Sequence, residues 1–292
     1  MTGVLGTNQY GKAETHMVTV TRDGARHTIR DLLVGITLSG DLEDVHITGD
    51  NAHVVATDTQ KNTVYAFAKE APVGAIEEFG LRLGRHFVAS FAPITRARVH
   101  IAEAGWERLG EHSFRQAGGE SRVATVVCEA QEEWVVSGLE GLVLLNSADL
   151  EFAGFVRDRY TTLAETTDRV LATAVTARWR HASAANADWD ASFLAARALL
   201  VDTFASTYSR SLQGTLYAMA DAMLRGRAEL AEVRMSLPNK HHYAVDLSPF
   251  GLENDNEVFH ADDRPYGLIE AAVLVPGAPP AGPAWDPYPL IP

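Results

Sequence analysis

The chain has 292 residues, of which 46% are hydrophobic and 22% charged, and these are ordinary values for a soluble globular protein. This length accommodates one large domain or two ordinary ones. The formal net charge of -13 disfavours nucleic acid and anionic lipid as partners, because their phosphate groups repel an acidic surface.

The first half of the chain predicts two strands, two helices and two more strands. Asp23-Gly24 is a turn signal between the first two β-branched runs, which therefore predict a long hairpin. The second helix is indicated by apolar residues that follow the spacing of a single stripe. The expected strands cover residues 17–21, 31–38, 96–102 and 121–128, and the helices begin near residues 58 and 75.

The second half predicts the same order of elements. Strands are expected at residues 134–145 and 169–180, helices at 193–204 and 212–223, and further strands at 233–237 and 243–247. The repeated order indicates an internal duplication, with similar domains at residues 1–135 and 136–275. Seven of the twelve prolines fall in residues 276–292, so this tail is expected to be a mobile or surface-draped extension.

Cysteine content and the absence of targeting patterns indicate the compartment. Cys128 is the single cysteine, which excludes an internal disulfide and a thiolate-rich zinc site. The sequence has no signal-peptide pattern, no peroxisomal Ser-Lys-Leu ending and no apolar run of about 18–20 residues. We therefore expect a cytoplasmic protein without membrane or nucleic-acid partners.

One motif resembles a phosphate-binding loop. Residues 6–12 match the G-x4-G-K pattern, but Ala13 stands where that loop needs Ser or Thr for Mg²⁺. No buried strand precedes the match, so nucleotide hydrolysis is disfavoured and Lys12 needs another explanation.

Several blocks of sequence carry the candidate chemistry. The clearest are Tyr10-Gly-Lys12, the run from Gly49 to Asn62 that contains Thr57-Asp58, and Ser236-Leu-Pro-Asn-Lys-His241. Two more are Gly154–Arg169 and Arg264–Glu270. In this order and spacing, over about residues 8–270, the blocks resemble the urate oxidase (uricase) family.

The resemblance implies a fold and a reaction. The fold would be an α+β tunnelling fold (T-fold), with two tandem domains that each hold an antiparallel sheet and two helices. Four subunits would form a homotetrameric barrel around a central tunnel. The reaction would be the oxidation of urate by O₂ and water to 5-hydroxyisourate and H₂O₂, without metal or other cofactor.

The resemblance also implies residue roles. Lys12, Thr57 and His241 would form a proton relay. Asn239 would hold O₂ or water. The backbone N–H groups of Asp58 and Leu212 would bind acceptor atoms of the purine ring. The implied substrate-binding residues are Thr57, Asp58, Phe152, Arg169, Leu212, Gln213 and Asn239. Lys12, Thr57 and Asp58 would face the remaining residues of a partner subunit, so that the pocket lies between chains.

Physical chemistry favours the same residue types. Urate is a flat anion, and arginine supplies a rigid, permanently charged donor fork while an aromatic ring supports the purine plane. Glutamine matches an edge that has both a donor and an acceptor. A buried lysine can act as a base, a threonine hydroxyl can relay a proton, and a histidine titrates near neutrality.

Other interpretations of these residues remain open. Thr57 or Asp58 alone is most simply a helix cap, and Arg169 could be ion-paired with the adjacent Asp168. Pro238 suggests a break between two strands, with Asn239 and His241 aimed into a pocket and His242 pointing elsewhere.

Two other classes of protein also remain open. A tunnelling-fold cyclohydrolase would need a zinc site with cysteine and histidine ligands, and a purine-binding homologue would need no proton relay.

Overall fold

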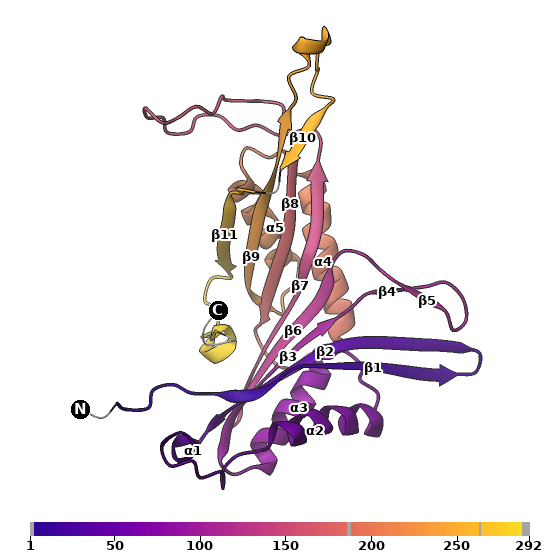
Figure 1. Cartoon of the computed structure of the whole chain (residues 1–292), viewed down its shortest axis with the longest axis vertical. Helices are drawn as coiled ribbons and strands as arrows, with labels where there is room; N and C mark the ends of the chain where they lie inside the picture. Colours follow the sequence, from indigo (N-terminus) through magenta and orange to yellow (C-terminus); the bar gives the residue numbers. More distant parts are fainter. Residues whose placement is uncertain (1–2, 186–187, 263, 288–292) are drawn as a thin grey trace. The chain divides into compact units, whose positions relative to one another are not determined.

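The computed structural model describes residues 3–185, 188–262 and 264–287. The chain divides into two compact units. Unit 1 comprises residues 1–138, 180–191 and 279–292, and unit 2 comprises residues 139–179 and 192–278. Each unit combines a β-sheet with helices, so the fold class is α+β (Figure 1). Within the described ranges, no helix is both long and apolar enough to cross a membrane.

Unit 1 is built on antiparallel strand pairs. β1 pairs with β2, β2 with β3 and β3 with β6, and β7 follows next in the sheet order. The expected hairpin is confirmed, with its turn at Gly24, whose φ of 58° favours glycine. The strands are β1 Tyr10–Asp23, β2 Arg26–Gly40, β3 Ile94–Glu103, β6 Ser121–Glu129 and β7 Glu132–Asn146.

Two long helices cover one face of this sheet (Figure 1). α2 spans Thr57–Glu70 and α3 spans Ile76–Ser90, close to the positions that the apolar spacing predicts. The α3 stripe is completely buried, including Phe79 and Phe87, and forms the core of the unit with β2 and β3. The short helix α1, Glu43–Ile47, precedes them and was not predicted from the sequence.

A buried polar cluster lies beside α3. The Glu77 side chain is fully buried, accepts a 2.7 Å hydrogen bond from the Ser137 hydroxyl and forms a 2.7 Å ion pair with Arg122. The Ser137 hydroxyl also lies 2.9 Å from His181 Nε2, and Arg122 forms a second ion pair with Asp190 at 2.5 Å. Burial raises the pKa of Glu77 despite the opposing charge of Arg122.

A small hairpin extends unit 1 between β3 and β6. Its strands are β4, Trp106–Arg108, and β5, Phe114–Gln116. The Trp106 indole donates a 3.0 Å hydrogen bond to Asp31 of β2, so this insertion is tied to the main hairpin.

Unit 2 repeats the succession of strands, helices and strands. In the sheet order β8 follows β7 and β9 follows β8, while β11 pairs antiparallel with β9. The new elements are β8 Leu171–His181, α4 Trp189–Ser206, α5 Leu212–Gly226, β9 Leu230–Ala244, the 3-10 helix η1 Ser248–Phe250, β10 Phe259–Asp262 and β11 Leu268–Leu274. Apolar residues of α4 and α5, such as Leu200 and Met219, are buried against this sheet. The order of elements expected for the second half is therefore present through β9.

The predicted break at Pro238 is wrong, because β9 continues from residue 230 to residue 244. The strand instead changes its pairing partner there. Pro238 is the last residue paired with β11, and His241 is already paired with β10. Proline lacks an N–H group, so its position at the end of one ladder removes no required hydrogen bond.

The predicted strand at residues 243–247 is present only at Tyr243 and Ala244, which belong to β9, and residues 245–247 are not strand. The Asn254 side-chain amide donates 2.8 Å hydrogen bonds to the carbonyls of Val245 and Val258, which closes a loop after β9. The last strand of unit 2 is β11, which was not predicted from the sequence.

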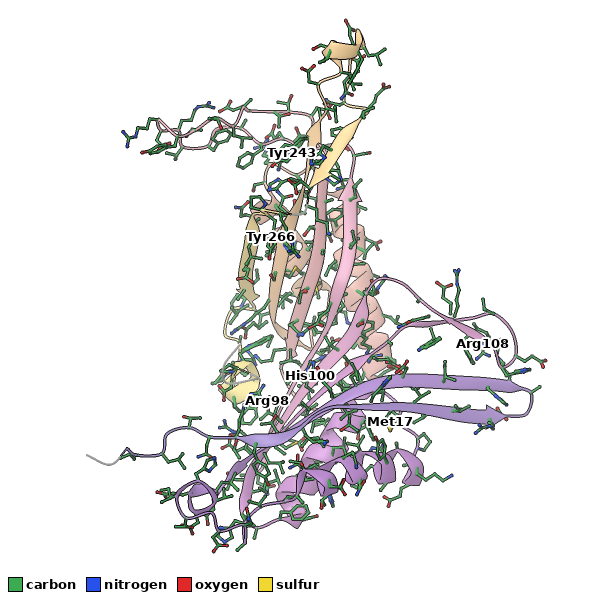
Figure 2. All side chains as sticks on the ribbon, viewed as in Figure 1. Met17, Arg98, His100, Arg108, Tyr243 and Tyr266 are labelled. Atoms are coloured by element: carbon green, nitrogen blue, oxygen red, sulfur yellow. The ribbon has the colours of Figure 1, made fainter. Side chains whose placement is uncertain are left out.

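The described part of the Pro-rich tail belongs to unit 1 from Pro279 to Pro287. Its 3-10 helix η2, Gly282–Trp285, lies beside Arg98, which is 6% exposed (Figure 2). The Arg98 guanidinium donates a 2.7 Å hydrogen bond to the carbonyl of Pro283, and Arg180 donates one of 2.9 Å to the carbonyl of Pro279. Residues 288–292 lie outside the described residues.

Candidate active site

Unit 2 contains a cavity of about 660 Å³. Its walls come from the segment between β7 and β8, the first turn of α5, and the ends of β9 and β10. Figure 1 shows that the β7–β8 segment leaves the sheet at the end where β10 lies. All the predicted site residues that belong to unit 2 line this cavity: Phe152, Arg169, Leu212, Gln213, Asn239 and His241.

The aromatic and cationic walls are held together by backbone pairing. Phe152 and Thr166 exchange two backbone hydrogen bonds of 2.7 and 3.1 Å, which folds the β7–β8 segment back on itself. This pairing brings the Arg169 guanidinium carbon to 5.2 Å from the centre of the Phe152 ring. The ring of Phe152, which lies under the cation, also stacks on Phe155 with a centroid distance of 5.0 Å.

Arg169 is a half-buried cation without a counter-charge among the residues that the structure describes. Burial lowers its pKa, and its Nε atom is buried without a hydrogen-bond partner. The proposed ion pair with Asp168 is not formed, because the Asp168 carboxylate instead accepts a 2.8 Å hydrogen bond from Asn256. A desolvated cation without a partner is costly, so its side of the cavity is suited to an anion.

The first turn of α5 lines the same cavity through Leu212 and Gln213. Ser211 is the N-cap, and its hydroxyl accepts a 3.1 Å hydrogen bond from the N–H of Gly214. The N–H groups of Leu212 and Gln213 precede the capped one and have no partner within the helix. Leu212 is buried and Gln213 is exposed, so the glutamine amide is accessible for an edge of a flat ligand.

Asn239, His241 and Tyr243 alternate along β9 and so share one face of the strand. The Asn239 backbone N–H donates a 2.8 Å hydrogen bond to the carbonyl of Gly267, and Asn239 lines the cavity. The rings of His241 and Tyr243 stack at 5.6 Å, and Figure 2 places Tyr243 at the β10 end of the strand.

The expectation that His242 points away from the pocket is wrong. His242 also lines the cavity, with its Nδ1 atom 3.0 Å from the carbonyl of Lys240 and its ring against Phe259. Phe259 belongs to β10, which forms another wall, so the cavity reaches both faces of β9 at this end. Within the described ranges, no group of three or more His, Cys, Asp or Glu side chains is placed to hold a metal ion.

The other predicted site residues lie in unit 1. Lys12 lies in β1, and Thr57 and Asp58 are the first two residues of α2. The interpretation of Thr57 or Asp58 as the N-cap is wrong, because Ala56 occupies that position and no side chain caps the helix. The first N–H groups of α2 are therefore left for another acceptor.

The Asp58 carboxylate is bound within its own helix. It forms a 2.5 Å ion pair with Lys61 and accepts a 2.9 Å hydrogen bond from Asn62. Its pKa is lowered mainly by the hydrogen bond and charge of Lys61 and, more weakly, by the charge of Lys12. The carboxylate is thus turned toward the helix surface, and only the backbone of Asp58 is suited to meet an anionic ring.

The sequence analysis did not identify several residues that line the unit 2 cavity or that contact the predicted site residues of unit 1. Asn256 and Phe259 line the cavity but lie beyond the quoted blocks, and only their pairing in space reveals them. In unit 1, Tyr10 and Gln60 contact the segment that precedes Thr57. Both are within the quoted blocks, but nothing in the sequence distinguishes their contacts from ordinary packing.

Comparison with known proteins gives consistent results. A family model described as Uricase matches residues 8–130 and 135–270. The Uricase of Arthrobacter globiformis is 52% identical over 285 residues, which cover 97% of this chain and 94% of that protein. The Uricase of Dictyostelium discoideum is 36% identical over 275 residues, which cover 91% of this chain and 96% of that protein.

Solved structures agree with the sequence matches. The crystal structure of the Arthrobacter globiformis uricase has a TM-score of 0.95 with this chain at 50% identity, and the match covers 98% of this chain and 100% of that one. A uricase from Bacillus fastidious has a TM-score of 0.79 at 22% identity, covering 93% of this chain and 94% of that one, which is a likeness of fold alone.

Proposed function

The chain belongs to the uricase family of oxidoreductases, and we propose that it oxidises urate with O₂ and water to 5-hydroxyisourate and H₂O₂ without a cofactor. The purine loses two electrons, and O₂ takes them together with two protons to become H₂O₂. The oxygen of the water enters the purine ring as a hydroxyl group. The protein therefore has to bind a flat anion, position O₂ and water, and move protons.

The environment of Arg169 is the main support for this proposal. Its guanidinium lies over Phe152 inside the cavity, partly desolvated and without a carboxylate partner among the described residues. A planar anion seated there would supply the missing acceptor and extend the stack of aromatic rings. Leu212 and Gln213 lie on another wall of the same cavity. The Gln213 amide and the N–H group of Leu212 would bind the polar edge of the purine.

The proton relay would consist of Lys12, Thr57 and His241. Among the described residues that line the unit 2 cavity, His241 is present but no lysine is. We infer that the base, Lys12, is supplied with Thr57 and Asp58 by a second subunit. This arrangement requires at least a dimer, and the family resemblance favours a tunnelling-fold homotetramer with a central tunnel.

In this mechanism, each member of the relay has a separate task. Lys12 would act as the base that accepts a proton from urate through the Thr57 hydroxyl, because the deprotonated purine donates electrons more readily. Asn239 would hold O₂ and then water above the purine plane. His241 would take the proton from water as its oxygen bonds to the oxidised ring.

The direct test is to mix the protein with urate in air after dialysis against a chelator. The proposal predicts that urate absorbance falls and that one H₂O₂ is released per urate. Binding of urate without its consumption would instead indicate a purine-binding protein. Activity that returns only with added zinc would indicate a hydrolase of the cyclohydrolase type.

A substitution separates the relay from the reaction as a whole. Lys12→Met should lower kcat by at least about 100-fold, the usual contribution of acid–base catalysis. Lys69→Met is the matched control, because Lys69 is an exposed lysine in the last turn of α2. Equal kcat for the two variants would contradict the relay while leaving the oxidase activity itself in place.

A further inference from the structure

The side chains of Tyr10 and Gln60 both bind the backbone of Val55, two residues before Thr57. The Tyr10 hydroxyl accepts a 2.7 Å hydrogen bond from the Val55 N–H and donates one of 3.2 Å to its carbonyl. The Gln60 amide donates a second bond, of 3.1 Å, to the same carbonyl. Both hydrogen-bonding groups of Val55 are therefore occupied by side chains from β1 and α2.

Gln60 also holds Lys12 directly. Its side-chain oxygen accepts a 3.1 Å hydrogen bond from the backbone N–H of Lys12. β1 is the first strand in the sheet order, so an N–H that points away from β2 has no partner in the ladder. A single glutamine side chain thus joins the strand that carries Lys12 to the segment that leads into Thr57.

The backbone around Lys12 needs such a restraint. The pairing of β1 with β2 shifts register between Lys12 and Thr15, and Glu14 has a φ of 51°. A bulge interrupts the ladder and leaves the local position of the strand less well determined. Gly11 fits closely against β2, because a Cβ atom there would lie 1.8 Å from the carbonyl oxygen of Ile36. The strand is therefore fixed on its β2 side by close approach and on its other side by Gln60.

The Gln60 side chain is a specific choice for this position. It is fully buried, and each end of its amide makes one hydrogen bond to a backbone group. A leucine would fill a similar volume but would leave the part-buried N–H of Lys12 without its acceptor. An apolar residue would therefore be the simpler solution if only packing mattered.

We propose that Tyr10 and Gln60 are positioning residues that fix Lys12 relative to Thr57. This inference rests on the proposed function, because it assigns the two residues to the proposed relay. Neither residue touches the substrate in this scheme. Each acts through the backbone of Val55, and Gln60 acts also through the backbone of Lys12.

The first experiment measures kcat for Gln60→Leu and Tyr10→Phe. Each value is divided by the fraction of sites that bind xanthine, a purine with one oxygen fewer than urate, so that misfolded protein does not count. We expect each variant to lose about 10- to 100-fold in kcat per site, since small misplacements of catalytic groups cost this much. Val64→Ala is the matched control, because Val64 is a fully buried residue one turn further along α2, and it should keep kcat per site.

The second experiment introduces Gln60→Leu into the Lys12→Met background. If Gln60 acts through Lys12, the second substitution should reduce kcat further by less than about 2-fold, because residues that act as a unit are not additive. Independent losses that multiply, or an unchanged kcat in both single variants, would overturn the inference. Tyr10→Phe provides the same test if Gln60→Leu does not fold.

The Lys12→Met variant distinguishes failure of the proposed proton relay from failure of the positioning role of Tyr10 and Gln60. If it keeps full activity, the proposed relay fails and the positioning role fails with it. If it loses activity while Gln60→Leu and Tyr10→Phe do not, the relay stands and only the positioning role is wrong.

Discussion

Replacing Arg169 should separate binding from stability. The substitution Arg169→Met removes a cation that would donate two charge-assisted hydrogen bonds to urate, worth about 1.5–3 kcal/mol each. The expected loss in kcat/KM is therefore roughly 100- to 10,000-fold. Arg169→Lys keeps the charge but loses the planar fork, so it should lose about one of the two bonds, or roughly 10- to 100-fold.

The free protein should not be destabilised by the same change. Within the described ranges the Arg169 guanidinium has no carboxylate partner, and burial already disfavours its charged form. Methionine retains most of the contact with Phe152 without a desolvated charge. We expect the free energy of unfolding of Arg169→Met to be unchanged or raised by up to about 2 kcal/mol.

The assay combines urate consumption with thermal unfolding of the ligand-free protein. Arg225→Met is the charge-matched control, because Arg225 is an exposed residue in the last turn of α5 that is ion-paired with Asp221. The opposite pattern for Arg169→Met, a fall in Tm of several degrees with unchanged KM, would refute the reasoning and make Arg169 a structural residue.

Three further predictions concern unit 1. Burial raises the pKa of Glu77, so its stabilising contribution is greatest below the unfolded pKa of about 4.3 and is lost as pH rises through the folded pKa. The Tm of Glu77→Gln should therefore improve relative to the parent as pH rises above the unfolded value, and an unchanged difference in Tm would contradict this. Gly84→Ala would place a Cβ atom 2.7 Å from the buried Cys128 sulfur and should cost about 1–3 kcal/mol in urea unfolding, most of which Cys128→Ala should restore. Deleting residues 278–292 removes the carbonyl that the buried Arg98 binds and should lower the free energy of unfolding by at least about 2 kcal/mol, whereas an unchanged urea midpoint would mean that the tail contributes nothing.

The regular elements were predictable because each buries one face. The apolar stripe of α3 and the Asp23-Gly24 turn are local patterns, and the structure has a helix and a hairpin turn at those places. The continuity of β9 was not predictable, because a proline inside an extended run normally indicates a break. Whether β9 continues depends on β10 and β11, whose residues pair with residues of β9 that lie 15 or more positions earlier in the chain.

In the candidate site, too, residues within sequence blocks could be predicted, whereas contacts between residues far apart in the sequence could not. The family resemblance indicated Phe152 and Arg169, and the structure brings both into one cavity. It could not show that Asp168 turns to Asn256 and leaves Arg169 without a counter-charge within the described residues. That property depends on a contact between residues 88 positions apart.

The most direct test of the account is complementation between two inactive variants. Lys12→Met and Arg169→Met chains, each with a different affinity tag, are co-expressed, and the mixed oligomers are isolated through both tags. If one subunit supplies Lys12 and another supplies Arg169, some sites in the mixed oligomer contain neither substitution, and urate oxidation should return to a substantial fraction of the parent rate. Activity that stays at the level of the two separate variants would contradict a site shared between subunits.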